Sequence, residues 1–312
     1  MITKPVNGVV NILKPPGMTS HDVVNVLRRI YKTKKVGHTG TLDPAAVGVL
    51  PICVGRATKI AQYIAGADKS YRAEITLGVV TDTQDSEGKV LSTTDASFIK
   101  EEHFKEVLKD FVGNIKQIPP MASAVKIKGK KLYQLHRMGQ VVEREPRNVK
   151  IHQLNIIWSQ GWGTAHPKAL CEVHCSKGTY IRTLCHDIGE KLGVGAHMSF
   201  LLRTSVAQFS IDNSITMEEL EEGDHQKVII AIDDVLKDYP VVTLREQAVK
   251  SVISGASLYP PGVLKKPKDL AGGQLVRLKH DDELLALAKT QIDEHDARKR
   301  FVFKPVCIIK ID

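Results

Sequence analysis

Long hydrophobic runs are missing from this sequence, and cysteine is scarce in it. No stretch of about 18 apolar residues occurs, which excludes an ordinary membrane-spanning helix. The five cysteines are odd in number and scattered, so we expect reduced, buried thiols rather than a disulfide framework. The short apolar run near the N-terminus stops at Lys14-Pro15-Pro16, unlike a signal peptide. These absences predict a cytoplasmic protein.

Metal ligands with the usual spacing are also lacking. Cys171, His174, Cys175 and His186 form a group that suggests a metal site. The segment ALCEVHCS, however, alternates as a strand, and no second pair of ligands accompanies it. We therefore expect structural cysteines and no bound metal.

Positive charge is abundant and unevenly distributed. The chain carries a net charge of +9 in 312 residues, which favours a polyanionic partner. Residues 126–150 alone hold eight basic and two acidic residues, a net +6. A solvated surface loop is the alternative interpretation. Interleaved apolar residues such as Leu132, Tyr133 and Leu135 favour an element that packs and also binds nucleic acid.

Strand and helix patterns occur together without strict alternation. SYRAEITLG (70–78) alternates polar and apolar residues and predicts a half-buried strand, with Tyr71 on its apolar face. Residues 9–13, VKIHQLNIIWS and ALCEVHCS predict further strands. Helices are predicted after Ser20 as the capping residue, over 97–112 with Gly113 as terminator, and in TYIRTLCHDIGEKLG. This mixture predicts an α+β fold with a mixed sheet.

The pattern changes near residues 238–240. A short helical segment, a Pro-Pro-Gly turn at 260–262 and three strand candidates near 274, 284 and 303 follow. They predict a compact, mostly β module of about seventy residues, near the lower size limit for a domain. We therefore expect two domains, 1–238 and 239–312.

The stretch GHTGTLDPAAVGVLP (37–51) holds one acid, Asp43, in a basic neighbourhood. Between Val23 and Ala67 the chain has seven basic residues and no other acid. Pro44 disfavours the helical conformation for Asp43, and the glycines allow a tight bend. The residues alone leave two interpretations open: a reactive carboxylate beside a polyanion, or an ordinary aspartate turn. The P-loop pattern GxxxxGK[ST] is absent, which excludes that phosphate-binding motif.

Four more residues have both a structural and a functional interpretation. His38 is either a loop histidine or a polar ring that faces nucleic acid. Arg182, in GTYIRTLCHDIG, either faces solvent or pairs with a buried acid. Tyr71 and Tyr180 either pack in the core or contact a base.

Five segments, in order, closely resemble the bacterial TruB family of tRNA pseudouridine synthases. They are NILKPPGMTSHDVV, KVGHTGTLDPAAVGVLPICVGRATK, KSYRAEITLG, PPMASAVKIKGKKLYQLHRMG and SKGTYIRTLCHDIG. The resemblance runs from about residue 5 to about residue 210. Ala122 stands where the family commonly shows an aromatic residue. The tail resembles, more weakly, the PUA-like RNA-binding module of the family.

The resemblance implies a fold and an activity. The fold is a catalytic domain with a mixed, largely antiparallel sheet, followed by a small, mostly β PUA-like domain. The activity is isomerisation of the uridine of the TψC loop of tRNA, position 55, after the base is flipped out. The family needs no cofactor or metal, and a monomer that binds the T arm of tRNA is implied.

The resemblance also assigns roles to residues. Asp43 matches the catalytic nucleophile, and Arg182 matches the arginine that pairs with it. His38 matches the residue that fills the space left by the flipped base, and Tyr71 matches the ring that stacks on that base. Tyr180 and Leu201 match pocket residues, and Lys14 matches a basic residue near the RNA backbone.

Residues 126–150 match a mobile insertion that clamps the T arm. Its expected RNA-binding residues are Lys126, Lys128, Lys130, Lys131 and Arg137.

Two rival functions remain. A guide-RNA-dependent synthase shares the catalytic core, but this chain lacks the long terminal extensions that bind partner proteins. An RNA chaperone without catalysis is the second, and the presence of Asp43, Tyr71 and Arg182 argues against it.

Overall fold

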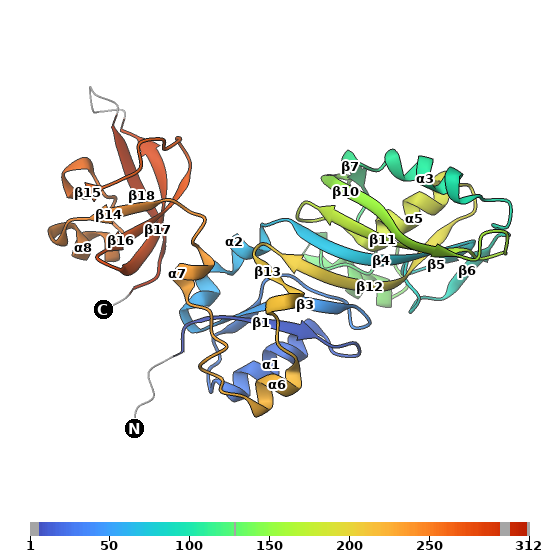
Figure 1. Cartoon of the computed structure of the whole chain (residues 1–312), viewed down its shortest axis with the longest axis horizontal. Coiled ribbons are helices and arrows are strands. Elements are labelled where there is room, and N and C mark those ends of the chain that lie inside the picture. Colours follow the sequence, from blue (N-terminus) through green and yellow to red (C-terminus); the bar gives the residue numbers. More distant parts are fainter. Residues whose placement is uncertain (1–5, 128, 294–299, 311–312) are drawn as a thin grey trace.

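The centre of the molecule is a nine-stranded mixed sheet (Figure 1). The computed structural model describes residues 6–127, 129–293 and 300–310. The sheet order is β1 (Gly8–Lys14), β3 (Val47–Val54), β12 (Ala196–Val206), β4 (Lys69–Leu77), β11 (Lys168–Cys175), β10 (Arg147–Gln160) and β7 (Gly113–Gln117). Two short strands, β2 (Val36–His38) and β13 (Phe209–Ser210), pair with β3 and β12. Within the described residues of this sheet, β3 and β12 form the one parallel pair, which confirms the mixed, largely antiparallel prediction.

Helices cover the two halves of this sheet (Figure 1). The helices α1 and α6 lie beside β1 and β3, whereas α3 and α5 lie beside β10 and β11. The helices of this part are α1 (Ser20–Ile30), α2 (Ala61–Ala65), α3 (Glu101–Lys109), α4 (Leu132–Arg137), α5 (Ile181–Lys191), α6 (Met217–Glu222) and α7 (Ile232–Val235), with the 3-10 turns η1 (Gly55–Ile60) and η2 (Ile211–Asn213). Two small hairpins, β5 (Val79–Thr81) with β6 (Val90–Thr93) and β8 (Lys126–Ile127) with β9 (Lys130–Lys131), project from it. No helix of the described residues is long and apolar enough to span a membrane.

The central strand β4 follows the alternation that its sequence predicts. Its inward side chains, Tyr71, Ala73, Ile75 and Leu77, are all buried in one continuous core. The strands predicted at 9–13, in VKIHQLNIIWS and in ALCEVHCS are present as β1, β10 and β11. The sequence pattern therefore identified four strands of this sheet, among them the one that carries Tyr71.

The capping residue of the first helix lies one position before the predicted one, so the helix begins at Ser20. Thr19, not Ser20, is the capping residue: its side chain accepts a hydrogen bond from Asp22 N, and the Asp22 carboxylate accepts one from Thr19 N. The Ser20 hydroxyl instead bonds Leu42, accepting from its N–H and donating to its carbonyl. The prediction was wrong because a tertiary contact employs the serine.

The helix predicted over 97–112 is shorter. The structure has α3 at Glu101–Lys109, preceded by a turn in which Asp95 accepts from Ser97 N. Gly113 does not terminate the helix; it has a positive φ of 103° and opens strand β7. The turn at Asp95 delays the start of the helix, and the chain enters strand β7 at Gly113.

The C-terminal part is a separate five-stranded sheet with one helix, as the sequence predicts (Figure 1). Its elements are β14 (Val241–Leu244), α8 (Glu246–Ile253), η3 (Pro260–Gly262), β15 (Val263–Lys265), β16 (Leu275–His280), β17 (Glu283–Ile292) and β18 (Phe301–Ile308). It packs on η1 and α2 through an apolar cluster that joins Ile60 and Ile64 to Leu287 and Cys307. Lys59 Nζ also donates to the Ile308 carbonyl at 2.8 Å. The contact fixes this module next to the nine-stranded sheet.

Candidate active site

Asp43 lies on the loop between β2 and β3. Hydrogen bonds hold this loop on several sides. Ser20 bonds both backbone groups of Leu42. The Pro44 carbonyl accepts from Gly17 N at 2.9 Å, and Ala46 N donates to the Asp43 carbonyl at 3.1 Å. The Asp43 carboxylate is therefore presented by a rigid loop, as a reacting group requires.

A glycine lets this loop enter the sheet. Gly48 starts the parallel pairing of β3 with β12, opposite Arg203, and its φ is +117°. A Cβ at this position would collide with the Arg203 backbone. A side chain at residue 48 would therefore push β3 away from β12 and displace the loop that carries Asp43.

Arg182, on α5, is the direct partner of Asp43. Its Nε lies 3.2 Å from Asp43 Oδ2; the Asp43 side chain is 39% exposed, and that of Arg182 is 7% exposed. Arg182 Nη1 lies 3.3 Å from Asp85 Oδ2, and Nη2 donates to the Ala122 carbonyl at 2.7 Å. Because the contact to Ala122 uses its carbonyl, the departure from the family's usual side chain does not alter it. Together with the Thr83 carbonyl, which also accepts from Nη1 at 3.3 Å, these partners fix the guanidinium, which in turn orients the Asp43 carboxylate.

The electrostatics of Asp43 contain opposing effects. Burial raises the pKa of its carboxyl above the ordinary range, the Arg182 guanidinium lowers that pKa, and the nearby Asp85 charge raises it. The net direction is upward. Asp43 is thus a more basic carboxylate than a solvated aspartate.

Tyr71 lies opposite Arg203 in the pairing of β4 with β12. Arg203 is 1% exposed, and it donates to the carbonyls of Val49 at 2.8 Å and Gly40 at 3.1 Å. Burial raises the pKa of Tyr71, so its hydroxyl stays protonated at neutral pH. Arg203 thereby ties the expected stacking ring to the loop of Asp43.

Three further predicted residues surround this centre. Leu201 is buried and pairs with Ala73, two strand positions from the pair of Arg203 with Tyr71 and on the same face of the sheet. Tyr180 is the capping residue of α5, and the Gln117 side chain bonds both its N–H and its carbonyl. His38 Nδ1 is buried and has no hydrogen-bond partner among the described residues; burial lowers the pKa of this histidine. Its ring is neutral and can accept a partner.

Lys14 was expected near an RNA backbone, but its side chain is buried in the protein. It is fully buried, and its Nζ donates to the carbonyls of Pro15 at 2.8 Å, Met18 at 2.7 Å and Pro44 at 3.1 Å. Burial lowers its pKa to about 8, and the Asp43 charge opposes that change. With its protons engaged, Lys14 supports the Asp43 loop rather than facing an RNA backbone.

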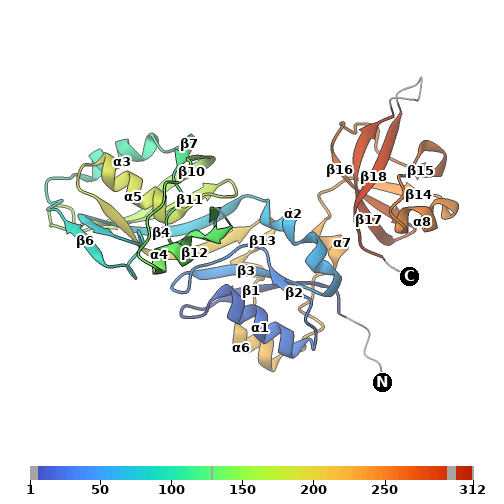
Figure 2. The same ribbon diagram turned by 180° about the vertical axis from the view of Figure 1, so that it is seen from behind.

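The basic insertion forms a small unit beside the site (Figure 2). Its hairpin β8–β9 and helix α4 share a core of Met121, Leu132 and Leu135. Lys126, Lys130 and Arg137 are exposed on it and Lys131 is partly exposed. Lys131 Nζ and the Arg137 guanidinium both lie over the Tyr133 ring, at 5.5 and 5.6 Å. The fifth expected clamp residue, Lys128, lies outside the described residues.

Asp85 and Arg203 were missed from the sequence. Asp85 lies in the polar segment TDTQDSEG, which has the composition of an ordinary turn. Arg203 follows Leu201 by two residues in a strand, and that period of two was a usable signal that both face the same side.

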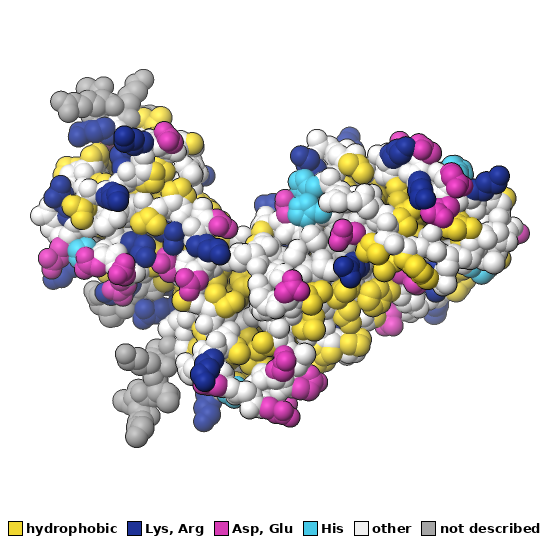
Figure 3. All heavy atoms as spheres, viewed as in Figure 1, with side chains coloured by type: hydrophobic (Ala, Val, Ile, Leu, Met, Phe, Trp, Pro, Cys, Tyr) yellow, Lys and Arg dark blue, Asp and Glu magenta, His cyan; other side chains and the backbone are white. Residues whose placement is uncertain are grey.

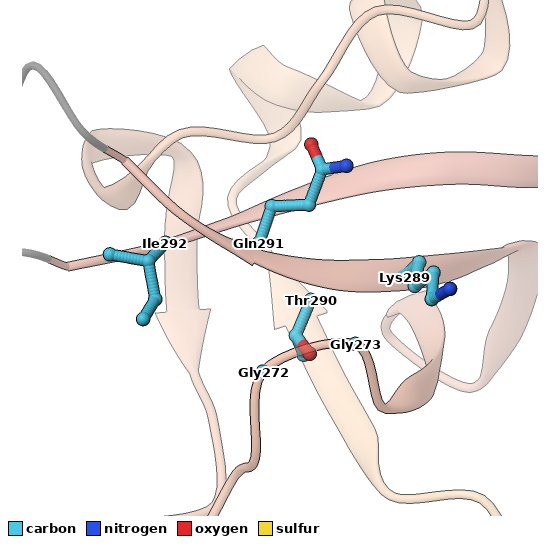
Figure 4. Close-up of a pocket in the computed structure, with 6 residues that line it drawn as sticks. All are labelled: Gly272, Gly273, Lys289, Thr290, Gln291 and Ile292. Atoms are coloured by element: carbon cyan, nitrogen blue, oxygen red, sulfur yellow. The ribbon is translucent and has the colours of Figure 1, made fainter.

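A hollow elsewhere has no connection to this chemistry (Figure 4). It measures about 570 Å³ and lies on the C-terminal sheet, lined by Gly272, Gly273, Lys289, Thr290, Gln291 and Ile292. The Thr290 hydroxyl there donates to the Ala271 carbonyl and accepts from Gln274 N. The Thr290 hydroxyl is thus engaged with the backbone, and none of the residues expected at the active site lines the hollow.

Three family models match successive parts of the chain, from residue 28 to residue 300. Residues 28–181 match the family described as TruB family pseudouridylate synthase (N terminal domain). Residues 182–239 match the tRNA pseudouridylate synthase B C-terminal domain, and residues 240–300 match the PUA domain.

Curated relatives agree over nearly the full length. The tRNA pseudouridine synthase B of Pelotomaculum thermopropionicum is 52% identical over 307 residues, 97% of each chain. That of Moorella thermoacetica is 42% identical over 311 residues, 98% of this chain and all of the other. Among solved structures, a Cbf5-Nop10-Gar1 complex contains a chain that matches with a TM-score of 0.73 and 31% identity, over 97% of this chain and 85% of that one.

Proposed function

Because the chain belongs to the TruB family of pseudouridylate synthases, we propose that it isomerises the TψC-loop uridine of tRNA, position 55, to pseudouridine. It is an enzyme of the isomerase class that makes pseudouridine in tRNA. The choice of this uridine, and the residues that act on it, belong to the proposal. The observation that best supports the proposal is the ion pair between Asp43, on its rigid loop, and Arg182, on α5, close to Tyr71.

The proposed reaction is balanced within the nucleotide. The bond from uracil N1 to ribose C1′ breaks, and a bond from C5 to the same C1′ forms. C5 loses one proton and N1 gains one, so no oxidant, reductant or co-substrate is consumed. The Asp43 carboxylate acts as the nucleophile, and Arg182 keeps it ionised and oriented.

The target base must leave the stack before it can reach Asp43. Extrusion of a nucleotide costs a few kcal/mol, which the pocket has to offset. Tyr71 stacks on the flipped base, Tyr180 and Leu201 enclose it, and His38 occupies the vacated space. The unpartnered Nδ1 of His38 supports this assignment, since a buried nitrogen without a partner is costly unless a ligand supplies one.

The remaining parts of the chain hold the RNA. We assign residues 1–238 to the catalytic domain, 126–150 to a clamp on the T arm, and 239–312 to a second RNA-binding domain. The separate C-terminal sheet and the exposed lysines of the insertion support this division. The proposal takes the enzyme to be a monomer, testable by light scattering, and to be cytoplasmic, where tRNA is modified.

Replacing the clamp lysines is expected to weaken tRNA binding and to flatten its salt dependence. In the triple variant Lys126→Ala/Lys130→Ala/Lys131→Ala, the slope of log K against log salt should fall by about two to three. Each phosphate contact contributes about 0.7 to 0.9 to that slope. Fluorescence anisotropy at several salt concentrations measures it.

A charge-matched control is available on the helical face. Lys105, Lys109 and Lys191 each pair with a carboxylate at 2.6 to 2.7 Å. Their triple alanine variant loses the same charge and should keep the wild-type slope. Equal slopes in the clamp variant and the wild type would remove the clamp from the RNA interface.

The rate is expected to fall in acid at a higher pH than an ordinary aspartate would produce. The ionised Asp43 is the reactive form, so activity is present above its pKa and is lost as the pH falls through it. Because that pKa is raised, the acidic limb should lie above about 3.9, the ordinary aspartate value. Single-turnover rates at saturating RNA, measured against pH, test this. A limb at or below the ordinary value would contradict it.

The substrate assignment is tested with isolated RNA hairpins. A T-arm hairpin should be converted, and the same hairpin with cytidine at the target position should not. An anticodon-arm hairpin of equal length serves as the control. Equal conversion of both arms would overturn the T-arm assignment while leaving pseudouridine synthesis intact.

A further inference from the structure

Three metal-binding side chains meet on the outer surface of the main sheet. Asp68 directly precedes β4, His152 lies on β10 and His174 lies on β11. One ligand atom from each lies within 4.8 Å of the others. His152 Nε2 is 3.0 Å from Asp68 Oδ2, and the two imidazole rings are 4.9 Å apart. Three elements, distant in sequence, thus converge on one spot.

Strand pairing explains the convergence. In the pairing of β11 with β4, His174 lies opposite Ser70, two residues after Asp68. An irregularity in the pairing of β10 with β11, between Ile151 and Gln153, leaves His152 as the extra residue next to His174. Such a bulge redirects a side chain, and bulges are common next to functional sites.

The cluster is on the face of the sheet opposite to the active site. Ser70 and Tyr71 are neighbours in β4, so their side chains point to opposite faces, and Tyr71 is the one in the core near Asp43. The side chains of His152 and Asp68 are 29% and 48% exposed. Figure 3 shows histidine side chains gathered on the viewed face of the main sheet. An ion bound here would be accessible from solvent and separate from the catalytic centre.

The orientation of His174 favours coordination. Its Nδ1 lies 3.0 Å from the Ser70 hydroxyl. With the proton on Nδ1 donated to Ser70, the lone pair of Nε2 is free, and the ring is held by an outer hydrogen bond typical of metal-ligating histidines.

The spacing and chemistry fit a zinc-class ion. Zn–N bonds of about 2.05 Å place tetrahedral ligand atoms about 3.3 Å apart. The pair of His152 Nε2 and Asp68 Oδ2 is already at 3.0 Å, and the ligand atom of His174, within 4.8 Å of both, has to approach to about 3.3 Å to complete the set. Two imidazoles with one carboxylate suit zinc, nickel and copper. We propose that Asp68, His152 and His174 bind one divalent transition-metal ion that links β4, β10 and β11 on the outer face of the sheet.

This proposal revises the expectation that the protein binds no metal. It does not restore the group of Cys171, His174, Cys175 and His186 as a metal site. Cys171 and Cys175 are buried on the inner face of β11, whereas His174 points outward. Of that motif, only His174 belongs to the proposed site. All five cysteines are buried, which reduces competition from thiols in a binding assay.

The test is a Zn²⁺ titration of the chelator-treated full-length protein by calorimetry, with Co²⁺ absorption as a second probe. We expect one tight site per chain. His174→Ala and Asp68→Asn should each weaken binding more than about tenfold, and Ser70→Ala, which removes only the outer hydrogen bond, about tenfold. The exposed His103 on α3 supplies the control His103→Ala, which should bind as the wild type does.

A thermal readout separates binding from folding. Zn²⁺ should raise the Tm of the wild type and of His103→Ala, but not that of His174→Ala, because an ion that binds only the folded state stabilises it. The metal-free variants should share the wild-type Tm, since the cluster is at the surface. Unchanged affinity in His174→Ala and Asp68→Asn, or no saturable binding by the wild type, would overturn the proposal.

Discussion

Asp43→Asn is expected to abolish pseudouridine formation and to leave tRNA binding intact. Asparagine keeps the shape of the side chain and its place near Arg182 but removes the nucleophilic carboxylate. Loss of the nucleophile of a covalent enzyme costs roughly 10⁴-fold or more in rate. The affinity for tRNA should remain within about threefold, less than 1 kcal/mol. Single-turnover conversion and anisotropy binding, measured on one preparation, test both parts.

The two readouts distinguish the rival functions. A matched control is Asp110→Asn, on the surface near Lys191, which should change neither quantity. Product formation at the normal rate by Asp43→Asn would remove Asp43 from catalysis. Tight tRNA binding without product in both the wild type and the variant would instead favour the RNA-chaperone function.

Replacing Arg182 is expected to cause the second large loss of rate, although Arg182 acts through Asp43. Arg182→Met leaves two partly buried acids, Asp43 and Asp85, without their shared cation, so Asp43 takes up a proton more readily and loses its fixed orientation. The rate at saturating RNA should fall about 10³-fold, and the acidic limb of its pH profile should move to higher pH. A purely structural role would lower stability without moving that limb.

Folding needs its own control here, because breaking a buried ion pair costs about 3–5 kcal/mol. Arg182→Lys keeps the charge but cannot reach three partners at once; it should fold and still lose about 10²-fold in rate. Arg72→Met, on an exposed position of β4, serves as the comparison. A wild-type rate and an unmoved pH profile in Arg182→Lys would contradict the positioning role.

The parts of the fold that rest on local patterns were predictable. The alternation in β4, β10 and β11 and the change of character near residue 238 were visible in the sequence. Element ends were less so, because they depend on contacts outside the element: Ser20 was assigned as a cap, yet Leu42 employs its hydroxyl. Likewise Gly113 opens a strand because β7 pairs with β10.

The residues of the site also differ in how predictable they were from the sequence. The loop around Asp43 is local, and its motif and the resemblance point to it directly. Asp85 reaches the centre only through a loop far from Asp43 and Arg182 in sequence, whereas the period of two from Leu201 was a usable signal for Arg203. The burial of Lys14 was equally hidden, since three carbonyls from two separate turns are needed to satisfy its ammonium. The cluster of Asp68, His152 and His174 depends on a bulge that no spacing rule predicts.

The bacterial relatives are more similar to this chain than the matching chain of the Cbf5-Nop10-Gar1 complex is. The chain is 52% identical to a bacterial tRNA pseudouridine synthase B but 31% identical to the matching chain of the Cbf5-Nop10-Gar1 complex, and it covers 85% of that chain. Both comparisons are compatible with the same catalytic core. The greater identity and coverage with the bacterial relatives favour an enzyme that acts alone.

The most direct test is to incubate the purified chain with an unmodified tRNA transcript and no other macromolecule. Pseudouridine is then mapped along the RNA by chemical labelling and primer extension. The account predicts one new pseudouridine, at the T-loop uridine. Modification at another position, or no product until a guide RNA or partner protein is added, would contradict it.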